Sequence, residues 1–146
     1  MENLNKNDYK KYSDKKVPKP PYLKNMINAF LVGGTICTVA QIITNILKSN
    51  GLDTEMAAAG TSISMVFIGA LLTGLGVYDK IAKVGGAGAA VPITGFANSI
   101  VSPAMEYKSE GFIFGVAAKM FTIAGPVLVY GVGASVIVGL MTLLLG

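Results

Sequence analysis

Residues 84–92 read VGGAGAAVP and open an uncharged run that continues to Met105. Glycine destabilises a helix interior by about 1 kcal/mol and proline by about 3 kcal/mol, whereas proline suits the first turn of a helix. The sequence therefore predicts a break over 84–91 and a helix over about 92–105. That helix covers roughly 21 Å, which is too short to cross the hydrocarbon core of a bilayer. We expect a broken or re-entrant segment, and the sequence leaves open whether 84–105 as a whole spans.

Longer apolar runs lie on both sides of this segment. Residues 25–47 and 56–77 precede it, and each is long enough for a spanning helix, which needs about 20 residues. The final run, 111–146, contains one charge, Lys119, and one proline, Pro126. It is longer than one span needs. We expect a short helix over about 111–122 and a full span over about 125–145, rather than one long kinked helix.

The composition indicates the same class of protein. Of 146 residues, 52% are hydrophobic and 14% are charged, whereas about a quarter are charged in ordinary soluble domains. The sequence thus predicts an all-α, polytopic membrane protein with about four to five hydrophobic helices. Its single helical membrane domain covers residues 22–146. The arithmetic excludes disorder, a disulfide scaffold and a typical soluble enzyme.

Basic charge is concentrated at the N-terminus. Residues 1–24 carry seven lysines and three acidic residues, and residues 25–146 carry five of each. By the positive-inside rule, we expect the lysine- and proline-rich tail, residues 1–21, to be cytoplasmic, together with a basic loop at 79–83. The tail is either a solvated leader or a docking site for a partner. No basic face with interleaved aromatic residues indicates nucleic-acid binding.

The chain lacks the residue type that is the commonest metal ligand and general base. The chain contains no histidine, and Cys37 is its one cysteine. A lone cysteine excludes an internal disulfide and a cysteine-based metal cluster, and no nucleophile–base motif is visible. We therefore expect no catalytic site, no metal site and no cofactor.

Four polar residues follow one another at intervals of four along the helix that is predicted after residue 92. They are Thr94, Asn98, Ser102 and Glu106, and they form one slowly drifting stripe on the helix surface. Polar groups in apolar surroundings need partners or water. The stripe could line a wet passage, or it could join helices by hydrogen bonds. The spacing does not decide between these two roles.

The broken stretch is a second candidate site. If Gly86 and Gly88 are buried, the helix that begins at Pro92 points free N–H groups into the membrane, where discontinuous helices hold anionic groups. Lys80 and Lys83 would then add positive charge at the mouth of the site. The alternative interpretation is a flexible surface turn.

A third candidate is the isolated charge of Lys119. An ionisable residue within an apolar run is a functional hypothesis by default, and a lysine that snorkels to the interface is the alternative. Small residues also predict close helix packing at two places. These residues are Gly69, Thr73 and Gly76 in one run and Gly131, Ser135 and Gly139 in another.

Several segments together resemble the stage V sporulation protein AC family, a membrane subunit of endospore-forming bacteria. The resemblance covers about residues 17–145, and its central glycine-to-asparagine block is also shared by a sister AE-type subunit. The segments that carry it are PKPPY at 18–22, ALLTGLGVYDKI at 70–81, GAGAAVPITGFANS at 86–99 and EYKSEG at 106–111.

The resemblance implies a place in a complex of the inner membrane of the spore. It implies that this complex moves dipicolinic acid, with calcium, into the forespore in sporulation and out in germination. The AC-type subunit is regarded as a tension-responsive channel component, with AD-type and AE-type subunits as partners. We thus expect a channel subunit, not an enzyme, in a homo- or hetero-oligomer. A non-conducting assembly scaffold is the alternative function.

Overall fold

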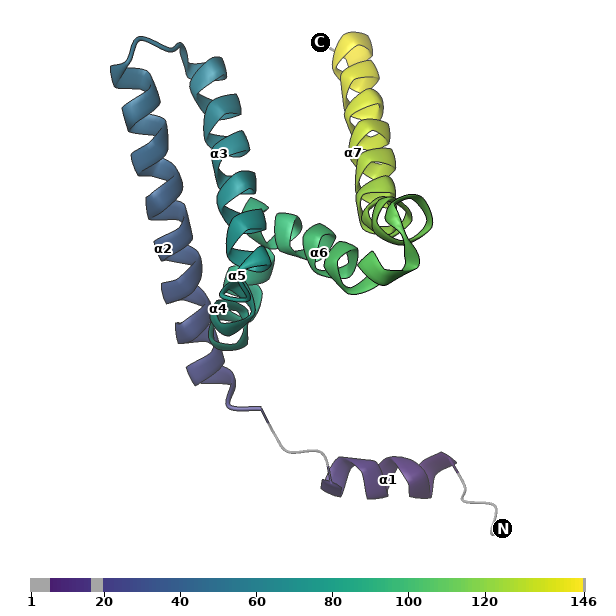
Figure 1. The fold of residues 1–146 in the computed structure, drawn as a ribbon. Coiled ribbons are helices and arrows are strands. Elements are labelled where there is room, and N and C mark those ends of the chain that lie inside the picture. Colours follow the sequence, from purple (N-terminus) through teal and green to yellow (C-terminus); the bar gives the residue numbers. More distant parts are fainter. Residues whose placement is uncertain (1–5, 17–19, 146) are drawn as a thin grey trace.

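The structure, a computed structural model, describes residues 6–16 and 20–145. Every regular element within these ranges is a helix, as the sequence predicted (Figure 1). In chain order they are α1 (Lys6–Lys16), α2 (Tyr22–Ser49), α3 (Thr54–Gly74), α4 (Tyr78–Gly85), α5 (Ala87–Ala90), α6 (Ile93–Glu106), the 3-10 helix η1 (Tyr107–Glu110), the π-helix η2 (Phe112–Ala117) and α7 (Ala118–Leu145).

Three helical stretches in the described chain are long and apolar enough to cross a membrane. They are Tyr22–Ser49, Thr54–Gly74 and Phe112–Leu145. The first is longer at both ends than the expected 25–47, and the second lies slightly earlier than the expected 56–77. An all-α polytopic membrane protein is therefore the class of this chain.

The first two spans, α2 and α3, form an antiparallel hairpin (Figure 1). Asp53 caps the N-terminus of α3, since its carboxylate accepts the Met56 backbone N–H at 2.7 Å. The hydroxyl oxygens of Thr44 and Thr61 lie 2.8 Å apart across the hairpin. Hydrogen bonds between hydroxyls join transmembrane helices in this way.

The C-terminus of α3 is a Schellman motif, which ends the helix earlier than expected. Gly76 has φ +67°, its N–H donates to the Thr73 carbonyl, and the Val77 N–H donates to the Leu72 carbonyl. Gly76 therefore lies outside the helix and not on the small-residue face with Gly69 and Thr73, which are both buried.

The segment expected as a basic loop at 79–83 is helical instead, because it forms the middle of α4. The helix stops at Gly86, whose φ of +50° and ψ of −122° suit glycine. One further turn, α5, follows. Pro92 then adopts extended backbone angles, φ −63° and ψ 163°, and starts α6. The broken segment thus consists of two short helices and α6, with breaks at Gly86 and at 91–92.

Glycine allows α4 and α5 to lie directly against α2. A Cβ atom at Gly88 would overlap the backbone carbonyl of Ala29, and one at Gly85 would meet the Val32 side chain at 2.6 Å. On the facing helix, a Cβ at Gly33 would lie 3.3 Å from the Gly88 carbonyl oxygen. This close backbone approach is typical of helices that associate in lipid.

The C-terminal run differs from the sequence expectation. We expected separate helices over 111–122 and 125–145, but η2 continues into α7, and Pro126 lies inside the helix. A proline clashes with the Cβ of the preceding residue in helical conformation, and Gly125 has none. Transmembrane helices also tolerate the missing hydrogen bond at a proline. Gly125 thus relieves one of the conflicts that would otherwise favour a break here.

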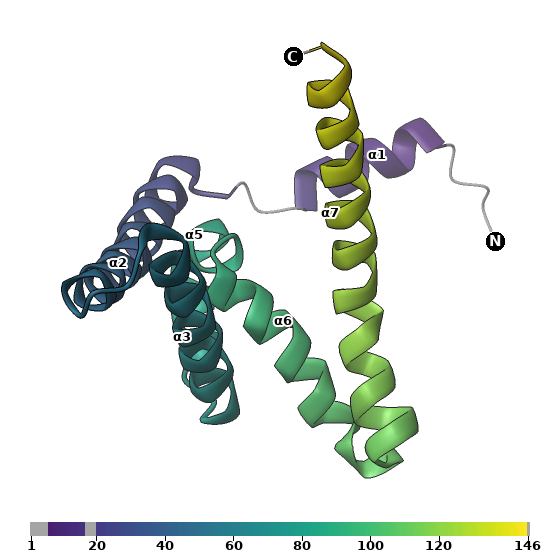
Figure 2. The ribbon, with the colours of Figure 1, turned by 90° about the horizontal axis from the view of Figure 1, so that it is seen from above.

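Figures 1 and 2 show α6 as a bridge from α3 to the start of α7, which stands apart from the α2–α3 hairpin. The most extensive helix pair is α3 with α6, whereas α7 contacts mainly α6 and η2. No residue of α7 is buried, so the predicted small-residue face at Gly131, Ser135 and Gly139 is exposed.

The N-terminal tail contains the helix α1, which the sequence analysis did not predict. In Figure 1 it lies apart from the other helices. Pro20 and Pro21 precede α2 and are not helical, in keeping with their restricted backbone. Residues 17–19 of the tail lie outside the described residues.

Candidate functional site

Tyr78 is the centre of the broken segment. It is 2% exposed, and its hydroxyl donates to the Ala89 carbonyl at 2.7 Å and lies 2.8 Å from the Thr94 hydroxyl. Because a tyrosine has one hydroxyl proton and a carbonyl can only accept, Thr94 must donate to Tyr78. This relay connects α4, α5 and α6 through one buried phenol.

A second polar contact fixes α6 to α3. The Thr73 hydroxyl lies 2.7 Å from the Gly69 carbonyl oxygen and 2.9 Å from the side-chain oxygen of Asn98. A Cβ at Gly69 would stand 2.9 Å from the Thr94 backbone, so the two helices touch where α3 has no side chain. Hydrogen bonds of this kind between membrane helices contribute about 0.6–2 kcal/mol each.

The predicted polar stripe is therefore divided between two environments. Thr94 is buried at 3% exposure, and Asn98 is half-buried, and both hold α6 in place. Ser102 and Glu106, in the second half of the same helix, are exposed. The first half makes the interhelical bonds that the sequence left as an alternative. The lining role stays a prediction for the second half.

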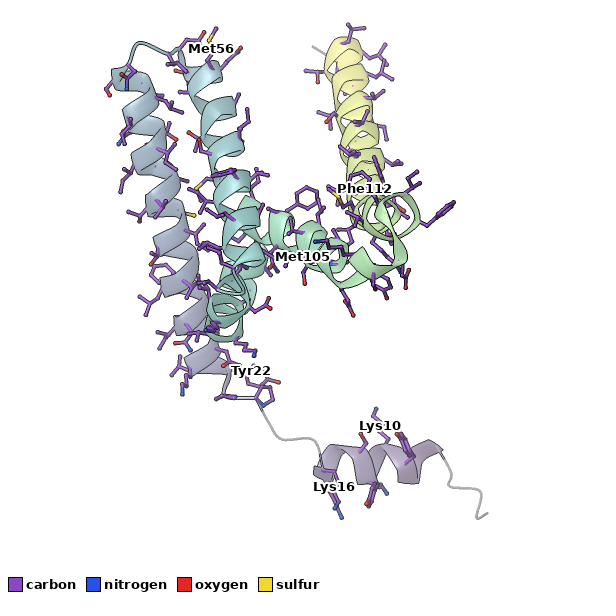
Figure 3. All side chains as sticks on the ribbon, in the orientation of Figure 1. Lys10, Lys16, Tyr22, Met56, Met105 and Phe112 are labelled. Atoms are coloured by element: carbon purple, nitrogen blue, oxygen red, sulfur yellow. The ribbon has the colours of Figure 1, made fainter. Side chains whose placement is uncertain are left out.

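A hollow of about 400 Å³ lies between the start of α2 and the α4–α5 break. Its polar contributors are Tyr22, Asn25 and Lys83, and its glycine is Gly86. Figure 3 shows Tyr22 at the foot of α2, the end that follows the tail. The structure thus brings Lys83 to the same end of the molecule as the N-terminus of α2. Lys80 is exposed on the same helix and does not line this hollow.

The expected arrangement around Pro92 differs from the observed one. Lys83 lies next to Gly86 and the start of α5, and Pro92 is not among the residues that line the hollow. Gly88 is in tight contact with α2, whereas Gly86 is exposed and has open space around it. The three backbone positions of the predicted anion site therefore serve different purposes. Gly86 turns the chain, Gly88 packs, and Pro92 starts α6.

Lys119 lies at the junction of α6 and α7. Its ammonium nitrogen is 3.8 Å from the centroid of the Tyr107 ring. At that distance a cation is attracted to the face of the ring, by about 0.5–2 kcal/mol depending on solvation. The lysine thus helps to close the corner between η1 and α7.

Two residues at the centre of this arrangement were not singled out as site residues by the sequence analysis. Tyr78 precedes a basic segment at the end of a span, where an aromatic residue is usual at the interface, so nothing predicted its burial. Gly33 lies within an ordinary apolar run, and only the contact with Gly88 reveals its role.

Comparison with known proteins places these features in context. Residues 25–141 match the family described as SpoVAC/SpoVAEB sporulation membrane protein. The chain is 48% identical to stage V sporulation protein AC of Bacillus subtilis (strain 168), over 142 residues that cover 97% of this chain and 94% of that protein. No solved structure matches the chain.

Proposed function

We propose a channel function for this chain, which belongs to the SpoVAC/SpoVAEB family of sporulation membrane proteins. In this function it is a subunit of the pathway that moves dipicolinic acid, with calcium, across the inner membrane of the forespore. Transport is inward in sporulation and outward in germination, and membrane tension contributes to opening. The proposal combines the resemblance of the sequence with the geometry of the broken segment.

The position of the break carries this function. Gly88 packs on Ala29 and faces Gly33, which lie roughly 10–16 Å along α2 from its first residue. Irregular backbone at membrane depth is tolerated where protein covers it or where it lines a water-filled cavity. Gly86 is exposed, and Val91 is 82% exposed. In the working assembly, another subunit or a water-filled passage therefore lies against this face.

The hollow beside the break is suited to a weak anion site. Dipicolinate is a small, flat dianion at neutral pH, and Lys83, Asn25 and Tyr22 supply an ammonium, an amide and a hydroxyl. A channel needs weak sites so that the transported ion can leave again. We assign Lys83 to the attraction of the dianion. Ser102 and Glu106, the exposed half of the stripe, are assigned to lining.

A single copy is too small to enclose a wide pore, because the described chain supplies three candidate spans. We therefore propose an oligomer, formed by several copies or with AD-type and AE-type subunits. The glycine-based contact between α2 and α5 would let the broken segment shift when bilayer tension rises.

The test is dipicolinate efflux from liposomes, read by terbium fluorescence before and after osmotic downshock. We expect efflux that rises on downshock, and a lower rate for Lys83→Gln than for the wild type. Lys80→Gln is the matched control, since Lys80 is on the same helix and does not line the hollow. If the folded protein gives no dipicolinate efflux, either alone or with its sister subunits, the channel function is wrong.

The alternative is a non-conducting scaffold, and one observation favours it. The tail forms a separate lysine-bearing helix, α1, which stands apart from the membrane helices and is free to bind a soluble partner (Figure 1). Deletion of residues 1–20 separates the two functions. A scaffold without its tail loses partner recruitment and all function, whereas a pore keeps its conductance after purification.

A further inference from the structure

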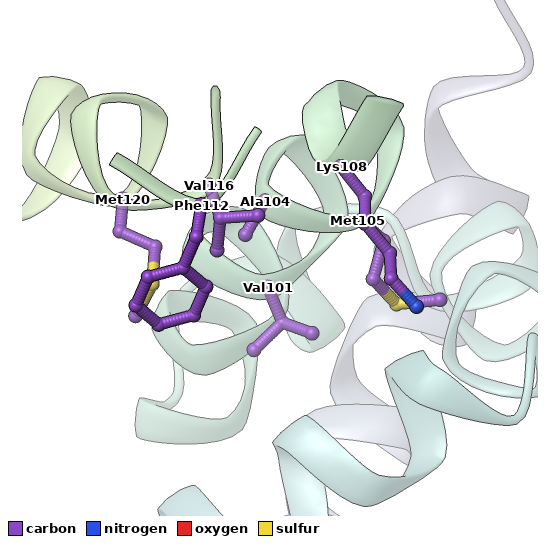
Figure 4. A pocket seen from close by; sticks show the side chains of 7 residues that line it. All are labelled: Val101, Ala104, Met105, Lys108, Phe112, Val116 and Met120. Atoms are coloured by element: carbon purple, nitrogen blue, oxygen red, sulfur yellow. The ribbon is translucent and has the colours of Figure 1, made fainter. Parts of the chain in front are cut away.

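The corner between α6 and α7 contains a second hollow, which the channel function does not use. It measures about 490 Å³, and one of its seven lining residues is charged. Figure 4 shows these residues around the opening, with Phe112 next to Met120 and with Lys108 beside Met105. The lining residues are Val101, Ala104, Met105, Lys108, Phe112, Val116 and Met120.

Specific contacts define the corner that encloses this hollow. Gly111 turns the chain with φ +98°, and Gly115 lies so close to the Tyr107 carbonyl that a Cβ would overlap it. Lys119 covers the Tyr107 ring from α7. Because these contacts hold η1, η2 and the start of α7 together, the hollow is a consequence of a fixed backbone path.

The lining determines the chemistry of an occupant. Six of the seven residues are apolar. Atoms that line an empty apolar hollow lack the dispersion attraction that an apolar occupant would supply. Met105 and Met120 have flexible side chains that adapt to an irregular apolar guest. The ammonium of Lys108 would pair with an anionic group, whereas the nearby carboxylates of Glu106 and Glu110 do not line the hollow.

The position of the hollow along the chain indicates that its occupant comes from the lipid bilayer. Glu106, Lys108 and Glu110 form a charged turn between two apolar helices, α6 and α7. Charges at the ends of membrane helices lie at the level of the lipid headgroups. A guest with its anionic group at Lys108 and its apolar body beside Phe112 thus has the orientation of a phospholipid in the bilayer.

We propose that this hollow is a binding site for an anionic phospholipid. One acyl chain lies between α6 and η2, and the phosphate pairs with Lys108. The lipid then covers the apolar corner where α7 meets the rest of the chain. This inference is independent of dipicolinate transport, since it concerns other residues and its test does not measure flux.

The absence of tryptophan from the chain permits a direct test. Phe112→Trp places the sole tryptophan of this chain at the hollow, and Val138→Trp places it on the exposed face of α7. Each variant is reconstituted in phosphatidylcholine vesicles with a small, equal fraction of brominated phosphatidylglycerol or brominated phosphatidylcholine. Bromine quenches a tryptophan that it touches, so quenching reports which lipid occupies the site.

We expect phosphatidylglycerol to be preferred at Phe112→Trp by about fivefold, the effect of one lysine near an anionic headgroup. The preference should disappear when Lys108→Gln is added and remain when Lys48→Gln, remote in the last turn of α2, is added instead. At Val138→Trp the two lipids should quench equally. If Phe112→Trp disturbs folding, as shown by circular dichroism, Met120→Trp is the second reporter.

Three results would overturn the site. Equal quenching by both lipids at the hollow would show ordinary lipid contact without selection. A preference that survives Lys108→Gln would show that the proposed pairing is wrong. Absence of quenching at the hollow, with normal quenching at Val138→Trp, would show that a second copy or another protein fills it.

Discussion

Replacement of Gly88 by alanine tests the contact that places the broken segment beside the first span. The added Cβ would overlap the Ala29 backbone carbonyl. The position of a Cβ is fixed by its own backbone, and the carbonyl is also backbone, so no side-chain rotation relieves the overlap. Either α5 moves away from α2 or the main chain distorts. The contact therefore predicts an effect from a single methyl group.

The expected loss of stability is compared with that of alanine substitutions at two other glycines. Extra methyl or methylene groups in a well-packed interior destabilise proteins by about 1–3 kcal/mol, and we expect Gly88→Ala to fall in this range. Gly34→Ala is the matched control, because nothing lies within 4 Å of its Cβ position. Alanine favours a helix over glycine by about 1 kcal/mol, so the control should be neutral or slightly stabilised. Gly33→Ala, with a contact at 3.3 Å, should lie between them.

The assay is unfolding of the purified protein in mixed micelles by increasing SDS, followed by far-ultraviolet circular dichroism. Gly88→Ala should unfold at a lower SDS fraction than the wild type, and Gly34→Ala should not. Equal midpoints for Gly88→Ala and the wild type would refute the reasoning, because they would mean that α5 does not rest on Ala29 in the membrane-like environment.

Two further predictions use the same assay. Tyr78→Phe removes the donor to Ala89 and the acceptor of Thr94, and should lower the free energy of unfolding by about 0.6–1.7 kcal/mol. Thr94→Val should then lower the free energy of unfolding by less in the Tyr78→Phe background than in the wild type. Strictly additive losses of stability would contradict the relay. Asp53→Ala removes the cap that accepts the Met56 N–H and should destabilise by about 1 kcal/mol. Asp53→Asn should retain most of the stability, and a loss equal to that of alanine would argue against capping.

Sequence reasoning predicted the spans well and their ends less well. Hydrophobic run length indicates a membrane helix because lipid offers no partner for backbone polar groups, and all three long helices lie where such runs do. Their ends depend on local hydrogen bonds, such as the Schellman turn at Gly76. The expected break near Pro126 was wrong, because α7 continues through this residue. Gly125 removes one of the conflicts that a proline creates, since it has no Cβ for the proline ring to clash with.

Sequence reasoning described the candidate site in part. The interval of four among Thr94, Asn98, Ser102 and Glu106 placed them on one face, since helix periodicity is local. Which of them bond to other helices depended on neighbours distant in the sequence. Thr94 pairs with Tyr78 and Asn98 with Thr73, whereas no such hydrogen bond involves Ser102 or Glu106 within the described residues.

The sequence by itself determined the membrane class, the three spans, the break after Lys83 and the family, because these depend on composition and on residues close in the chain. Tertiary structure alone decided that the break lies against α2, that Tyr78 is buried, and that α7 leaves α6 at a corner with a hollow. These features depend on backbone contacts between segments far apart in sequence, such as Gly33 with Gly88. The sequence shows that a glycine has no side chain, but it does not show which helix packs against that glycine. Only the folded structure shows that contact.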